Sequence, residues 1–223
     1  MLLDAGSGAI GNLQTALAYG ALDAIVISHM HADHFFDIVP LRYGLTYGLR
    51  RATRLPLWLP PNGSPTLQAI AAPFTGERDF FGNVFDVREY DPTGTLKVGD
   101  LGLTFTPALH YIEAYAIRAE VPGATFAYTG DTAPCDAVAA HARGAALFLC
   151  EATLGLGSES PPRGHTSARE AGTMARQADV EHLALTHYYS GVEPADLIAA
   201  ARDEFAGPIT VVDDGMEFSL PFD

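Results

Sequence analysis

The chain is poor in cysteine and has no long apolar run. Only Cys135 and Cys150 occur among 223 residues, and they lack CxxC spacing. We therefore expect no disulfide framework, a cytoplasmic location and a buried packing role for Cys150. No apolar stretch reaches the roughly 20 residues that cross a bilayer, and no signal peptide is visible after Met1. A membrane is thus not an expected partner.

Basic residues are also scarce, with 13 Lys and Arg against 27 Asp and Glu and a net charge of −14. A chain of this charge does not attract polyanions through its overall field, so bulk nucleic acid is not an expected partner. Arg50, Arg51, Arg54 and Arg163 are either local contacts for a small phosphate ester or solvated surface charges.

The chain has the length and the 48% hydrophobic content of a single domain, 1–223, with one large core. Strand-like and helix-like segments alternate, which is typical of an α/β fold with helices on the sheet faces. Ser167 and Glu170 have the spacing of a capping box at a helix start. Strands are expected at 55–59, 101–106, 115–120, 125–129, 146–150, 183–186 and 209–212, and helices at 10–19, 33–41, 66–72, 134–144, 167–178 and 194–205.

The richest motif is the segment from Ser28 to His34, which holds His29, His31, Asp33 and His34 directly after an apolar run. Imidazole nitrogens and carboxylate oxygens are ligands for zinc and similar divalent ions. If a strand ends at Ser28, His29 and His31 point the same way, whereas Asp33 and His34 fall in the following turn. This arrangement suits two metal ions better than one. The alternative is a histidine cluster that is solvated or satisfied in the core.

Three further polar residues, His110, Asp131 and His187, each follow an apolar run of strand-like residues. In layered α/β folds, ligands gather at the carboxyl ends of strands. Each residue alone is more typical of a loop or a helix cap, but together with the first motif they complete two coordination spheres.

The order of these motifs resembles that of the metallo-β-lactamase superfamily, in which Asp4 matches a structural aspartate beneath the metal site. The resemblance implies a four-layer αβ/βα sandwich. Relatives usually carry strands before the segment that matches Leu2 to Gly8, so we expect either a true start further upstream or a first sheet that lacks its N-terminal edge strands. Because an open sheet edge invites pairing, we expect loop cover or a homodimer.

Two segments, Glu151-Ala152-Thr153 and Gly164 to Ala168, resemble the ribonuclease Z branch of that superfamily. There, a Glu and a His pair beside the metals and assist the leaving group, which implies these roles for Glu151 and His165. The alternative for His165 is a surface residue near a helix start. The resemblance implies two divalent ions, with Zn²⁺ expected and Mn²⁺ or Fe also accepted. By this match one metal has the ligands His29, His31 and His110, the other has Asp33, His34 and His187, and Asp131 bridges them.

The implied reaction is hydrolysis by a metal-bound hydroxide that two metals generate from a shared water, and the expected catalytic residues are Asp33, Glu151 and His165. Ribonuclease Z enzymes that process tRNA insert a basic arm between the segments that hold His110 and Asp131. Only 20 residues separate the two here, so we expect a small phosphodiester, such as a cyclic nucleotide. The alternatives are a lactonase or other carboxylic-ester hydrolase, and a ribonuclease Z without the arm. A metal-binding module without turnover is disfavoured because every ligand is present.

Aromatic residues gather between 74 and 90 and recur near the motifs. They either wall a substrate pocket or belong to the core or to a dimer contact. His141 and His182 are expected at the surface. The aromatic residues concerned are Phe74, Phe80, Phe81, Phe85, Tyr90, Tyr43, Tyr47, Tyr111, Tyr188 and Tyr189.

Overall fold

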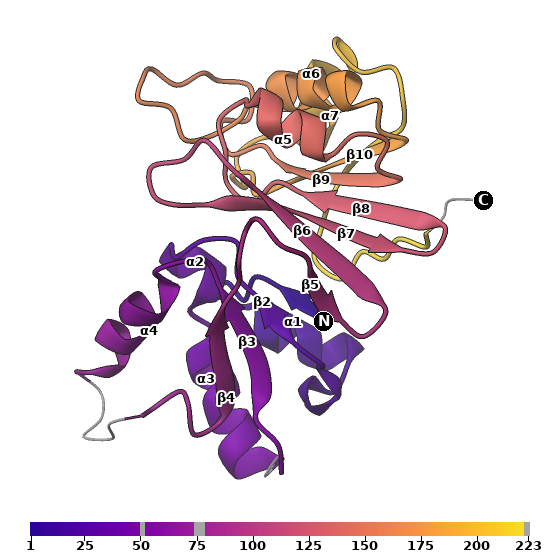
Figure 1. Cartoon of the computed structure of the whole chain (residues 1–223). Coiled ribbons are helices and arrows are strands. Elements are labelled where there is room, and N and C mark those ends of the chain that lie inside the picture. Colours follow the sequence, from indigo (N-terminus) through magenta and orange to yellow (C-terminus); the bar gives the residue numbers. More distant parts are fainter. Residues whose placement is uncertain (50–51, 74–78, 221–223) are drawn as a thin grey trace. The chain divides into compact units, whose positions relative to one another are not determined.

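The computed structural model describes residues 1–49, 52–73 and 79–220 (Figure 1). The chain divides into two compact units, Met1–Asp91 and Pro92–Asp223. The expectation of a single domain over the whole chain stays a prediction. Among the described residues no helix is long and apolar enough to span a membrane.

The first unit contains a four-stranded parallel sheet of order β1-β2-β3-β4. Its strands are β1 (Leu2–Leu3), β2 (Ile25–Val26), β3 (Leu55–Leu59) and β4 (Phe85–Glu89). Its helices are α1 (Ala9–Ala16), α2 (Ala32–Phe35), α3 (Ile38–Tyr43) and α4 (Gly63–Ala71), with a 3₁₀ helix at Tyr19–Ala21 and a π-helix at Gly44–Gly48. β1 and β4 form the two edges of this sheet, and the homodimer expected from an open edge stays a prediction.

The core of the first unit forms on one face of this sheet. Alternate residues of β3, namely Leu55, Leu57 and Leu59, are fully buried and pack in one cluster with residues of α1, α3 and α4. This follows from the period of two in a strand, which puts every second side chain on the same face. Most of the aromatic segment joins this unit's interior, and Phe80, Phe81 and Phe85 also line a cavity of about 610 Å³. Phe74 lies outside the described residues. The buried members are Phe80, Phe81, Phe85 and Tyr90.

The second unit contains a seven-stranded mixed sheet of order β11-β10-β9-β8-β7-β6-β5. Strands β8 to β11 are parallel, and β5 to β8 are antiparallel neighbours. The strands are β5 (Leu96–Val98), β6 (Leu101–Pro107), β7 (Tyr115–Val121), β8 (Ala124–Tyr128), β9 (Leu147–Glu151), β10 (His182–Thr186) and β11 (Ile209–Val211). The connections between the parallel strands contain α5 (Asp136–His141), α6 (Ala168–Ala178) and α7 (Pro194–Arg202), which lie on one face of the sheet (Figure 1).

Small residues let the helices of the second unit pack closely. A Cβ added at Gly172 in α6 would lie 2.4 Å from the carbonyl oxygen of Ala201 in α7, so only glycine fits there. Phe148 and Cys150 of β9 are buried beneath these helices. The predicted burial of Cys150 is confirmed, and both cysteines are free.

Helix α6 begins with the predicted capping box. The Ser167 hydroxyl accepts a hydrogen bond from the Glu170 backbone N–H, and the Glu170 carboxylate accepts one from the Ser167 N–H. We expect Ser167→Ala to lower the free energy of unfolding by about 1 kcal/mol, measured by urea denaturation. Gln177→Ala, at an exposed position of the same helix, is the control and should leave the midpoint unchanged. Equal midpoints for both variants would contradict the prediction.

Most predicted elements are present with small shifts of their ends, but one predicted helix is divided in two and the strands β4 and β5 were not predicted. The helix expected at 33–41, with Asp33 as its cap, is two short helices, and the N-cap of the first is His31. Pro134 precedes α5, which begins at Asp136. Strand β4 was not predicted because it is an edge strand with charged residues at three of its five positions, which hides the apolar pattern.

Candidate metal centre

Asp4 organises the histidine cluster of the first unit. Its Oδ1 accepts a hydrogen bond from the Ser28 N–H at 2.7 Å. Its Oδ2 accepts from the Ser28 hydroxyl at 2.7 Å and lies 2.7 Å from His34 Nδ1. Asp4 follows β1 with a φ of 56°, a left-handed conformation that Asp tolerates better than most residues. It is thus buried beneath the His29–His34 segment, as its predicted structural role requires.

These contacts determine which imidazole nitrogen faces outward. A carboxylate only accepts hydrogen bonds, so Nδ1 of His34 carries the proton and Nε2 keeps a lone pair. The Ser28 hydroxyl gives its only proton to Asp4, so it accepts from His29 Nδ1, 3.1 Å away. Both imidazoles therefore offer Nε2 to a metal, as supporting hydrogen bonds do in known metal sites.

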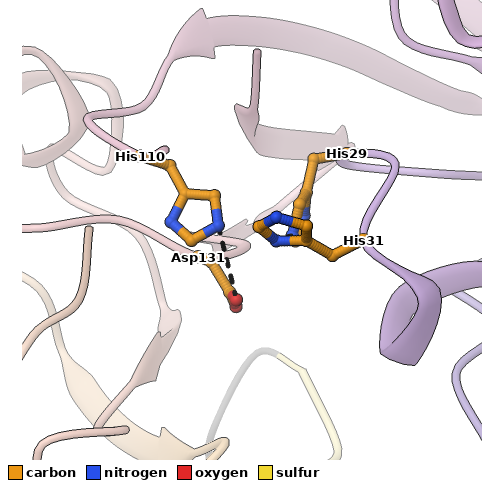
Figure 2. Close-up of side chains that lie close together, drawn as sticks. All are labelled: His29, His31, His110 and Asp131. Carbon is orange, nitrogen blue, oxygen red and sulfur yellow. Dashed lines mark hydrogen bonds and ion pairs between the residues drawn. The ribbon is translucent and has the colours of Figure 1, made fainter. Parts of the chain in front are cut away.

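His29 and His31 lie on the same side of the chain, as the period of two predicted (Figure 2). His29 Nε2 and His31 Nδ1 are 3.1 Å apart. Two nitrogens that bind one tetrahedral zinc ion at about 2.1 Å are roughly 3.4 Å apart, so this pair fits a shared cation. Asp33 is exposed in the first turn of α2, and its roles as ligand and catalytic residue stay predictions.

In the second unit, the three residues that follow β6, β8 and β10 lie at the carboxyl ends of these strands, at the same end of the sheet. They are His110, Asp131 and His187. His110 Nε2 lies 3.9 Å from Asp131 Oδ2 (dashed line in Figure 2), and His187 Nε2 lies 3.7 Å from Asp131 Oδ1. Each oxygen of one buried carboxylate therefore faces a different imidazole. This is the geometry expected of a carboxylate that bridges two cations.

Hydrogen bonds at Nδ1 hold both of these imidazoles. The Gly164 carbonyl accepts from His110 Nδ1 at 2.7 Å, so Nε2 of His110 keeps its lone pair. Thr153 Oγ1 lies 2.8 Å from His187 Nδ1. His187 has a φ of 54°, an unfavourable conformation of the kind that concentrates at functional sites. A donor set of oriented imidazoles and carboxylates is suited to divalent metal ions.

Glu151 and His165 pair beside Asp131. Glu151 is fully buried at the end of β9, and its Oε1 lies 3.0 Å from His165 Nδ1 while also accepting from the Thr132 N–H. His165 Nδ1 is 4.0 Å from Asp131 Oδ2. The hydrogen bond with Glu151 raises the pKa of His165, against the opposing effect of desolvation. The sequence motifs predicted the histidines and carboxylates described above as site residues. They did not predict the supporting roles of Ser28, Thr153 and the Gly164 carbonyl.

Of the four arginines singled out in the sequence, two lie in the described residues, and their role toward a phosphate ester stays a prediction. Arg163 forms an ion pair with Glu170 at 2.8 Å, so its charge is already matched. Arg54 is exposed and donates to the Gly82 carbonyl, while Arg50 and Arg51 lie outside the described residues.

His141 and His182 are half-buried rather than at the surface, and desolvation lowers the pKa of each. Of the remaining tyrosines, Tyr188 is half-buried, and the exposed ones are Tyr43, Tyr47, Tyr111 and Tyr189.

Comparison with known proteins identifies the family. Residues 1–188 match the family described as the beta-lactamase superfamily domain. The chain belongs to this superfamily. It is 36% identical over 225 residues to the Mycobacterium leprae protein ML1173, with 99% of this chain and 78% of that protein covered.

Ribonuclease BN of Escherichia coli O157:H7 is 30% identical over 240 residues, which cover 85% of this chain and 78% of that protein. The crystal structure of the metallo-beta-lactamase fold protein YhfI from Bacillus subtilis superposes with a TM-score of 0.85 at 25% identity, covering 96% of this chain and 85% of that one. The predicted α/β fold and the ribonuclease Z-like branch are confirmed. The protein is a metal-dependent hydrolase of this superfamily.

Proposed function

We propose that this hydrolase cleaves a small phosphodiester of the cyclic nucleotide class and uses two divalent ions, in the first instance Zn²⁺. The observation that carries the proposal is the Glu151–His165 pair, 3.0 Å apart, beside the Asp131 carboxylate. A phosphodiester needs a proton for its departing alkoxide, and this pair supplies one. A lactonase of the same fold does not require the pair.

Both halves of the donor set support two ions. Asp131 offers one oxygen toward His110 and the other toward His187, and in the first unit His29 and His31 present nitrogens 3.1 Å apart. When bound, divalent ions lower the pKa of water and offset negative charge on a phosphoryl oxygen. We propose that His29, His31 and His110 hold one ion, that Asp33, His34 and His187 hold the other, and that Asp131 contacts both.

His165 then serves the leaving group. Glu151 Oε1 holds the ring through Nδ1, so the proton for the departing oxygen is carried on Nε2. The buried carboxylate stabilises the imidazolium form electrostatically. Glu151 is itself held by the N–H groups of Thr132 and Thr153, so the pair is oriented before any substrate binds.

The segment between His110 and Asp131 supports a small substrate. It consists of the β7–β8 hairpin, in which Val121 pairs with Ala124 across a two-residue turn. No inserted arm is present in this described segment to grip a folded RNA, and the net charge of −14 disfavours a polyanion. A nuclease activity, which the name of ribonuclease BN raises, is therefore the second candidate.

A substrate panel with a leaving-group comparison tests the proposal. We expect turnover of cyclic nucleotides and bis(p-nitrophenyl) phosphate, and none of acyl-homoserine lactones. We expect His165→Ala to reduce kcat for cyclic nucleotides by about 10²- to 10⁴-fold. The loss on bis(p-nitrophenyl) phosphate should be much smaller, because p-nitrophenolate departs without a proton. His182→Ala is the control and should keep the wild-type kcat. His182 lies at the start of β10, where its Nε2 is hydrogen-bonded to Thr210 Oγ1 of β11.

Other outcomes would overturn parts of the proposal. Faster turnover of a lactone than of any diester would favour a carboxylic-ester hydrolase, and preferential cleavage of RNA would favour a nuclease. Equal losses of His165→Ala on both diesters would contradict the leaving-group role. One metal ion or fewer per chain by mass spectrometry would contradict the pair of ions.

A further inference from the structure

Glu159 lies in the loop between β9 and α6, and its carboxylate accepts hydrogen bonds from three groups. The Tyr111 hydroxyl donates to its Oε1. Its Oε2 accepts from the Gly164 N–H at 2.8 Å and from the His165 N–H at 3.2 Å. Glu159 is half-buried and its neighbours Ser158 and Ser160 are exposed. Both of its oxygens are thus engaged, on a stretch of chain that is otherwise at the surface.

These contacts connect Glu159 to two site histidines. Gly164 donates its N–H to Glu159 and accepts from His110 Nδ1 through its carbonyl at 2.7 Å. A shift of this glycine would therefore move the hydrogen bond that orients His110. The next N–H along the chain belongs to His165, and Glu159 holds that group as well. One carboxylate supports the backbone beneath both imidazoles.

The Tyr111 ring also contacts Gly164 and lies beside both histidines. A Cβ added at Gly164 would lie 2.5 Å from Cζ of Tyr111, so the ring packs directly on the glycine backbone. The ring centroid is 5.0 Å from that of His110 and 5.6 Å from that of His165. By holding the Tyr111 hydroxyl, Glu159 keeps this ring against both histidines.

We propose that Glu159 is a positioning residue that orients His110 toward the metal and His165 toward the leaving group. The part that concerns His165 rests on the proposed function, whereas the part that concerns His110 requires only metal binding. Supporting hydrogen bonds of this kind are worth about 10- to 100-fold in metal affinity or activity.

The experiment compares Glu159→Ala with Glu159→Gln. The amide oxygen of Gln still accepts from the Gly164 and His165 N–H groups, and its NH₂ donates to the Tyr111 oxygen. We therefore expect Glu159→Ala to lower Zn²⁺ affinity, measured by competition with a chelator, by about 10- to 100-fold. Glu159→Gln should restore most of the affinity. Tyr111→Phe, which removes one of the three contacts, should have a smaller effect in the same direction.

Two further measurements separate positioning from a general structural role. At Zn²⁺ concentrations that saturate every variant, Glu159→Ala should reduce kcat more for a cyclic nucleotide than for bis(p-nitrophenyl) phosphate, and should add little loss in the His165→Ala background. The His110 Nδ1–H proton resonance should shift in the NMR spectrum of Glu159→Ala and return with Gln. Glu181→Ala, an exposed glutamate of the same unit, is the matched control.

Wild-type Zn²⁺ affinity and an unshifted His110 resonance in Glu159→Ala would overturn the proposal. If Glu159→Ala does not fold, Glu159→Gln and Tyr111→Phe decide, and loss of affinity in Gln equal to that in a His110→Ala variant would also contradict it. If the wild-type protein hydrolyses no diester, the proposed function fails. The affinity and the resonance then still test whether Glu159 orients His110.

Discussion

Replacing Asp131 by alanine is expected to abolish metal-dependent hydrolysis and the stabilisation that metal gives. Each oxygen of this buried carboxylate faces a different histidine, His110 or His187. Loss of this carboxylate should lower metal affinity and activity by more than the roughly 10- to 100-fold that follows removal of a supporting residue. The measurements are metal content by mass spectrometry and kcat/KM on the preferred diester.

The same variant gives a readout that does not depend on activity. Zn²⁺ at 100 times its Kd should stabilise the wild-type protein by about 2.7 kcal/mol, which raises the Tm of a chain of this size by roughly 5–10 °C. Asp131→Ala should show little of this shift, and a chelator should remove it from the wild type. Asp136→Ala, at an exposed position in α5, should keep it. A full Zn²⁺-dependent shift in Asp131→Ala would sink the proposed role.

Replacing Asp4 by alanine is expected to destabilise the first unit and weaken metal binding together. Three donors, the Ser28 N–H, the Ser28 hydroxyl and His34 Nδ1, lose their acceptor in a buried place. Each unsatisfied group costs about 1–3 kcal/mol, so the free energy of unfolding should fall by about 3 kcal/mol or more in urea denaturation. Zn²⁺ affinity should fall about 10- to 100-fold, because His29 and His34 lose their orientation.

Asp4→Asn is the matched variant for this prediction. Asparagine tolerates the φ of 56° at this position and keeps one carbonyl oxygen as an acceptor. We therefore expect a smaller loss of stability and a partial loss of affinity. If Asp4→Ala matched the wild type in Zn²⁺ affinity after correction for its stability, the link from Asp4 to the imidazoles would be wrong.

The candidate ligands were predictable because each is a polar residue at the end of an apolar run. That pattern is local, and so it locates His110, Asp131 and His187 without knowledge of the fold. The groups that orient them were not predictable, because they come from distant segments. The Gly164 carbonyl that holds His110 lies 54 residues further along the chain, and Thr153 lies 34 residues before His187. A backbone carbonyl also carries no mark in the sequence.

The secondary structure was likewise predictable where the sequence pattern is local, and not where it depends on packing against distant segments. Strands whose two faces are buried, such as β9 and β10, were predicted almost to the residue, since nearly every position is apolar. The aromatic segment was ambiguous because a bulky ring suits a core and a pocket equally well. Its assignment to the core depended on α3, α4 and the neighbouring strands, which bury Phe80, Phe81 and Phe85 together.

The close approach of Gly172 to Ala201 has a consequence for motion in the site. His165 lies just before α6, whereas His187 directly follows β10, and their rings are stacked with centroids 6.2 Å apart. Because backbone meets backbone between these helices, neither helix has room to slide toward the other. We therefore expect a bulkier substrate to be accommodated by rotation of side chains and by the surface loops rather than by a shift of α6 against α7.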